Sequence, residues 1–86
     1  MELSDLEIQG ILKKFVSEEL LNNGSTINSD DNLLLDGMVD SLGFLRFVAF
    51  IEETYNLKIS YEDQIIENFG SIDKIADYLQ KRLVSA

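Results

Sequence analysis

Few side chains in this chain can do covalent chemistry, because its 86 residues include no histidine and no cysteine. That composition excludes disulfides, thiolate nucleophiles, most zinc sites and the usual general base, so an enzyme acting alone is the least favoured class of protein. One hydroxyl stands out by its position. Ser41 follows Asp40 where an apolar pattern with helical spacing begins, and a serine at the mouth of a helix has a reachable hydroxyl.

The same pair of residues has a purely structural interpretation. Asp and Ser are among the residues that most often cap the N-terminus of a helix, so Asp40 or Ser41 can be the N-cap and nothing more. Further aspartates at 30, 31 and 36 suggest calcium binding, but leucines occupy positions that an EF-hand loop reserves for ligands. The spacing therefore predicts no metal site.

Length and charge narrow the class of protein further. Residues 1–86 are expected to form a single domain with a modest core. The sequence has no apolar run that spans a bilayer, and its N-terminus is acidic rather than signal-like, so we expect a cytoplasmic monomer. The net charge of −9, from 16 acidic and 7 basic residues, argues against binding to nucleic acid or to an anionic membrane surface.

The elements that position Ser41 are helices, and the predicted fold is an all-α four-helix bundle of three long helices and one short third helix. The first helix opens at Ser4, with Glu7 in capping-box position, and stops at residues 22–24. A long loop follows, and the second helix runs from Ser41 to about Tyr55, where Asn56 ends it in a left-handed conformation.

A short third helix over residues 61–67, capped by Ser60, and a last helix from residue 72 complete the predicted bundle. Helical spacing and the apolar residues of the long loop predict the core. The residues expected to face it are Ile8, Ile11, Leu12, Phe15, Val16, Leu20, Ile27, Leu33, Leu34, Leu45, Val48, Ile51, Tyr55, Ile72, Ile75, Ala76, Leu79 and Leu83.

The second helix is apolar on more than one face, whereas a helix with one face in water needs only a single apolar face. Phe47 is expected in the core, whereas core packing and surface exposure both remain open for Phe44 and Phe50. If these rings form an exposed stripe, the chain is a cofactor-free helical interaction domain. That is the alternative from a different class of function.

Taken in order, these features resemble the acyl carrier protein superfamily, the phosphopantetheine-bearing acyl, aminoacyl and peptidyl carriers. The resemblance covers essentially the whole chain. It is carried by Leu33-Leu34, Gly37, Asp40-Ser41-Leu42, Ile51-Glu52-Glu53 with Tyr55, Ile59, and Asn68-Phe69-Gly70-Ser71-Ile72. The tripeptide at 40–42 is unspecific by itself, but the ordered set is specific.

The resemblance implies a non-catalytic carrier in which Ser41 bears a covalent 4′-phosphopantetheine arm, with Gly37, Asp40 and Leu42 as supporting motif residues. A phosphopantetheinyl transferase would install the arm, and downstream acyl-processing enzymes would act on the cargo. A phosphodiester also suits a helix N-terminus, where free N–H groups and the positive end of the dipole lie. The arm supplies the thiol that the chain lacks.

Two departures from the fatty-acid-synthesis members point to a particular kind of carrier. Gly43 and Arg46 stand where those members commonly have acidic residues, and two residues separate Gly37 from Asp40. This form looks more like D-alanyl or stand-alone aminoacyl and aryl carriers, which an adenylate-forming ligase usually loads. The role of a fatty acid or polyketide carrier is the alternative.

A partner-binding face is expected around the attachment point. It is predicted from position on the chain, since its residues flank Ser41 or lie along the next turns of its helix. The residues are Met38, Val39, Leu42, Arg46 and Phe50.

Overall fold

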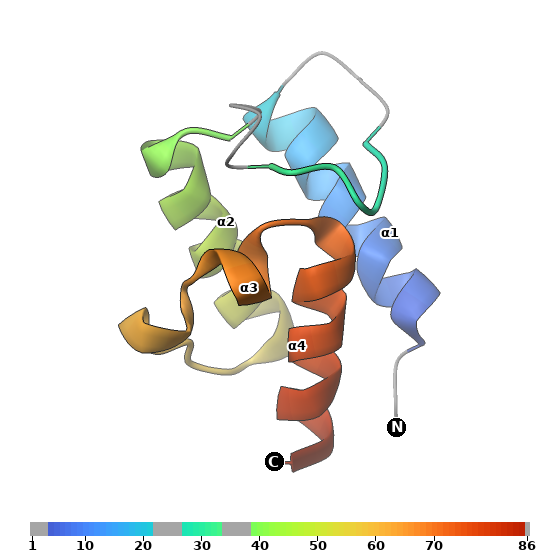
Figure 1. Ribbon diagram of the computed structural model, residues 1–86, viewed down its shortest axis with the longest axis vertical. Coiled ribbons are helices and arrows are strands. Elements are labelled where there is room, and N and C mark those ends of the chain that lie inside the picture. The colour runs from blue at the N-terminus through green and yellow to red at the C-terminus, as the bar shows by residue number, and fades with distance from the viewer. Residues whose placement is uncertain (1–3, 22–26, 34–38, 86) are drawn as a thin grey trace.

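The computed structural model describes residues 4–21, 27–33 and 39–85, and all the regular secondary structure in these ranges is helical (Figure 1). The elements are α1 (Asp5–Phe15), a π-helical segment η1 (Val16–Leu20), α2 (Ser41–Tyr55), a 3₁₀ turn η2 (Tyr61–Asp63), α3 (Ile66–Phe69) and α4 (Ile72–Ser85). The prediction of three long helices and one short third helix is confirmed.

The first helix begins as predicted, because the Ser4 hydroxyl accepts a hydrogen bond from the Glu7 N–H at 3.1 Å. It does not continue as a regular α-helix. At Val16 it passes into η1, where the Leu21 N–H donates to the Val16 carbonyl five residues back, at 2.8 Å. The predicted stop at residues 22–24 lies outside the described part of the chain.

The third element is shorter and less regular than predicted. Residues 61–67 form a 3₁₀ turn and only the beginning of α3, and the Ser60 side chain makes no capping hydrogen bond. In Figure 1 the short α3 lies between α2 and α4. The Phe69 ring at its end meets Phe44 of α2 edge-on at 6.0 Å and Tyr78 of α4 at 5.1 Å.

The core lies where α1, α2 and α4 face each other, and most of the predicted core residues are buried in it. Three expectations need correction or stay untested. Ile11 lies at the rim with 36% of its surface exposed, Leu45 is exposed, and Leu34 lies outside the described residues. Phe47 is buried, as expected.

The described part of the first loop is joined to the bundle by its backbone. Ile27 and Leu33 are buried, the Leu33 N–H donates to the Gly70 carbonyl at 2.9 Å, and the Asp73 N–H donates to the Ser29 carbonyl at 2.9 Å. These bonds attach the loop to the start of α4.

Side-chain hydrogen bonds from α2 and α4 hold the segment between these two helices. The Glu52 carboxylate accepts the Ile59 N–H at 2.8 Å, and the Tyr78 hydroxyl donates to Asp63 at 2.7 Å. Arg82 donates to the Tyr78 hydroxyl and, at 2.7 Å, to the Lys58 carbonyl. Side chains of α2 and α4 thus fix both the start of this segment and η2.

Candidate functional site

Ser41 is the first residue of α2 and is exposed. The sequence left open which residue of the Asp40-Ser41 pair is the N-cap, and the structure assigns that role to Asp40. Its carboxylate accepts the Gly43 N–H at 2.7 Å, and its carbonyl accepts the Phe44 N–H at 2.8 Å. Because Asp40 is the N-cap, the Ser41 hydroxyl is not needed to cap the helix.

The electrostatics at this position favour an anion beside Ser41. The first N–H groups of an α-helix lack intrahelical partners, and the positive end of the helix dipole lies there. The 15 residues of α2 make that dipole well developed. Between Ser41 and Ile51 the sequence contains no acidic residue and one cation, Arg46, although the chain as a whole carries a charge of −9.

The backbone just before Ser41 is fixed in the bundle. Val39 is only 5% exposed, and its N–H donates to the Leu33 carbonyl at 3.0 Å. The prediction that Val39 belongs to the partner face is therefore wrong, because its side chain packs in the core. Gly37 and Met38 lie outside the described residues, so their predicted roles are not addressed by the structure.

The exposed face of α2 is centred on Leu42, whose surface is 69% exposed. Leu45 is 60% exposed, and the spacing of three residues places it about 60° to one side of Leu42. Arg46 is also exposed, about 40° to the other side. Sequence reasoning assigned Leu45 to the core and so missed it, because α2 is apolar on more than one face and spacing alone does not separate its inner from its outer residues.

Phe50 lies at the α1 edge of this face, about 80° from Leu42. It is half-buried, and its ring stacks on Phe15 with centroids 4.1 Å apart. Phe44 is also half-buried but packs on the opposite side, against Phe69 of α3. Phe47 and Phe50 both stack on Phe15, whereas Phe44 meets Phe69, so the phenylalanines of α2 do not form one exposed stripe.

The segment between α2 and α4 also exposes large apolar side chains. Ile65 and Ile66 are more than two-fifths exposed, and Tyr61 is almost fully exposed. Large apolar side chains without burial mark contact surfaces when they gather. The sequence analysis gave no role to these three residues.

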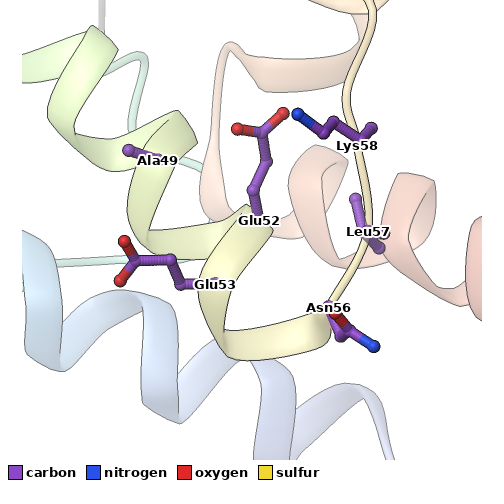
Figure 2. Close-up of a pocket in the computed structure, with 6 residues that line it drawn as sticks. All are labelled: Ala49, Glu52, Glu53, Asn56, Leu57 and Lys58. Atoms are coloured by element: carbon purple, nitrogen blue, oxygen red, sulfur yellow. The ribbon is translucent and has the colours of Figure 1, made fainter.

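A shallow hollow of about 390 Å³ lies at the other end of α2 and is distinct from the Ser41 position. Figure 2 shows the Glu52 carboxylate and the Lys58 ammonium group facing each other across it. Since α2 rises about 1.5 Å per residue, some 20 Å separate its two ends. The Glu52 carboxylate also accepts a hydrogen bond from the Ile59 N–H, so this side chain has a structural role at the hollow.

Within the described ranges, no helix is long and apolar enough to cross a membrane. In the same part of the chain, no three acidic side chains gather as a set of metal ligands.

Comparison with known proteins agrees with this geometry. The family model described as "Phosphopantetheine attachment site" matches residues 11–79. The acyl carrier protein of Onion yellows phytoplasma (strain OY-M) is 31% identical over 70 residues, which cover 81% of this chain and 90% of that protein. The acyl carrier protein of Guillardia theta is 25% identical over 83 residues, covering 96% of this chain and all of that protein.

A solved structure shows the same fold. The NMR structure of the HMG-ACPI domain from the CurA module of Lyngbya majuscula superimposes with a TM-score of 0.76, covering 95% of this chain and 80% of that domain, at 24% sequence identity.

The class defined by this fold and site is the helical carrier with a prosthetic arm. The chain belongs to the acyl carrier protein superfamily, whose members bear covalently attached 4′-phosphopantetheine and serve as carriers rather than catalysts. Its partners as a member of that family are a phosphopantetheinyl transferase and acyl-processing enzymes.

Proposed function

We propose that Ser41 is the residue that bears the 4′-phosphopantetheine arm. This proposal rests on the different roles of Asp40 and Ser41 at the start of α2. Asp40 caps the helix, and Ser41 is left exposed at the positive end of the dipole with its hydroxyl free of that role. A phosphodiester on this hydroxyl would lie beside backbone N–H groups, which suit an anion.

The attachment step needs groups from another protein. The Ser41 oxygen forms a bond to the phosphorus of the pantetheine phosphate of coenzyme A, and the bond from that phosphorus to the leaving adenosine 3′,5′-bisphosphate breaks. The hydroxyl proton must pass to a base. This chain has no histidine, and the Asp40 carboxylate serves as the helix cap through its bond from the Gly43 N–H, so we assign the base to the transferase.

The arm then supplies the thiol that the sequence lacks, and the cargo travels as a thioester. Tethering confines the acyl group near successive active sites, which raises its effective concentration there. A carrier without catalytic side chains is useful for this reason.

We further propose that Leu42, Leu45 and Arg46 form the surface on which partner enzymes dock. They are exposed on one face of α2, within two turns of Ser41. Phe50 contributes only the edge of a ring that is stacked on Phe15.

The proposed cargo is an amino acid or a small or aryl carboxylic acid, activated as an adenylate and transferred by a ligase. Arg46 would repel enzymes whose basic docking patches fit an acidic second helix, at roughly 0–1 kcal/mol for a surface pair. The Phe44 ring meets Phe69 between α2 and α3, which leaves little room there for a long chain.

A carrier of fatty acid or polyketide synthesis is the second candidate. It is supported by the relatives, since the phytoplasma and Guillardia theta proteins are both named acyl carrier protein. The two candidates differ in the enzyme that loads them.

The experiment has two stages. Wild-type protein and Ser41→Ala are incubated with coenzyme A and a broad-specificity phosphopantetheinyl transferase, and intact masses are compared. We expect the wild type alone to gain the arm, and a gain by Ser41→Ala would refute the assignment.

The modified protein is then offered to a fatty-acid-type malonyl transferase and to adenylating ligases with an amino acid panel. Loading by a ligase supports the proposed cargo. Efficient malonyl loading with no ligase activity would establish the second candidate instead.

A further inference from the structure

The first turn of α2 contains an unusually close contact at Gly43. A Cβ atom built on this residue would lie 3.1 Å from Asp40 Oδ1, 3.3 Å from Val39 Cγ1 and 3.7 Å from Leu20 Cδ2. The first two distances are shorter than ordinary van der Waals contacts. Glycine is therefore the residue that lets these three side chains close over the turn that begins with Ser41.

The two nearest neighbours have little freedom to move away. Asp40 Oδ1 is held by the hydrogen bond that it accepts from the Gly43 N–H at 2.7 Å. Val39 is buried in the core, and its N–H is bonded to the Leu33 carbonyl at 3.0 Å. Any side chain at position 43 must displace Asp40, Val39 or the turn itself.

The third neighbour, Leu20, brings η1 to the same turn. Leu20 is the last residue of η1, whose π-helical geometry is rare and often occurs at functional sites. The preceding residue of η1 makes a second contact, because the Glu19 carbonyl lies 3.5 Å from an Arg46 guanidinium nitrogen. η1 therefore touches α2 at two places within two turns of Ser41.

We propose that Gly43 is a positioning residue for the transfer of phosphopantetheine to Ser41. It acts through Asp40 and through the packing of Val39 and Leu20, which together fix the turn from which the Ser41 hydroxyl projects. This inference rests on the proposed function, since it takes Ser41 as the acceptor. It also gives Gly43 a packing role, in addition to the absence of an acidic group at that position.

The test is a pair of matched glycine-to-alanine substitutions. Gly43→Ala adds the methyl group that meets the three neighbours. Gly10→Ala is the control, because Gly10 is exposed on α1 and a Cβ there would have nothing within 4 Å. Transfer from coenzyme A is followed by intact mass with a broad-specificity transferase, and kcat and KM are determined well below the melting temperature of each variant.

For Gly43→Ala we expect kcat to fall about tenfold or more with little change in KM, since small misplacements of a reacting group can cost up to roughly 100-fold. KM depends on the exposed face around Leu42, which the substitution leaves in place. Gly10→Ala should transfer at the wild-type rate and melt at a higher temperature, because alanine is the better helix former.

A second variant separates positioning from loss of stability. Val39→Ala in the Gly43→Ala background removes the methyl group that would lie 3.3 Å from the added Cβ, while Asp40 Oδ1 at 3.1 Å stays in place, so kcat should recover in part. The melting temperature should fall further, because a buried side chain is truncated. A purely structural effect of Gly43→Ala would leave kcat as low as in the single variant, or lower.

The possible outcomes are distinct. Wild-type kcat in Gly43→Ala, a raised KM with unchanged kcat, or no recovery in the double variant would each overturn this inference while leaving Ser41 as the acceptor. Failure of the wild type to gain mass would refute the proposed function, and this inference with it.

Discussion

Substitution of Leu42 by alanine should separate partner binding from stability. Leu42 is 69% exposed, so about a third of its surface is removed from water in the folded protein. Full burial of a leucine side chain contributes about 1.5–3 kcal/mol, so the stabilisation lost with Leu42 is about 0.5–1 kcal/mol. For a domain of this size that corresponds to a fall in Tm of about 2–8 °C.

Leu42→Ala should cost more free energy in loading by a partner enzyme than in stability of the fold. The minority of interface residues whose truncation costs more than about 1 kcal/mol cluster near the centre of the surface, which is where Leu42 lies, and a cost of about 1.4 kcal/mol corresponds to a tenfold loss. We therefore expect kcat/KM for loading of the modified Leu42→Ala protein to fall about tenfold. The assay uses an adenylating ligase that loads the wild type.

Phe47→Ala provides the opposite case. Its ring is 1% exposed, so truncation should reduce the free energy of unfolding by about 3–5 kcal/mol. Loading by the fraction that remains folded should be unaffected. If Leu42→Ala instead loads at the wild-type rate and its Tm lies far below the wild-type Tm, the Leu42 side chain stabilises the core and the proposed docking face is wrong.

Three further predictions concern the cap, a tyrosine and the space between α2 and α3. Asp40→Ala should lose about 1 kcal/mol of stability in urea denaturation, whereas Ser41→Ala should change it by less than about 0.5 kcal/mol; equal losses would contradict the assignment of the cap. Burial, and then the hydrogen bond to Asp63, raise the pKa of Tyr78 above its ordinary value of 10.0. The Tyr78 hydroxyl therefore contributes its full share of the free energy of unfolding below pH 10, and this share is lost as pH rises through the folded-state pKa. Tyr78→Phe should lower the free energy of unfolding by about 1–2 kcal/mol at neutral pH. The variant should also lose less stability than the wild type at alkaline pH, as measured by urea denaturation across this pH range. Phe44→Ala should destabilise the fold by about 2–4 kcal/mol, given a half-buried ring, and should slow the attack of added thiol on a long-chain acyl thioester; unchanged attack would show that the ring does not limit the space.

Much of the fold could be predicted because local signals mark its helices. α2 begins at Ser41 and ends at Tyr55 as predicted, and Asn56 has the left-handed φ of 53° expected of a helix terminator. The Ser4 cap was equally local. Such features depend on a few neighbouring residues, which the sequence displays directly.

The errors occur where the outcome depends on distant residues. α2 is apolar almost all round, so spacing alone could not show that Phe44 packs inward and Leu45 outward; the position of α3 decides it. Val39 precedes the cap and has no periodic pattern, and its burial depends on the bond to Leu33. The π-helical turn at Val16 likewise has no local sequence signal.

The cap at Asp40 has a consequence for the unmodified protein. Since the start of α2 does not depend on residue 41, we expect the chain to fold equally well before and after it receives its arm, with the same Leu42 and Leu45 exposed. Both forms would then occupy the same partner enzymes, but only one can deliver cargo. An excess of unmodified carrier would act as a competitive inhibitor, and throughput would depend on the fraction modified as well as on the total amount.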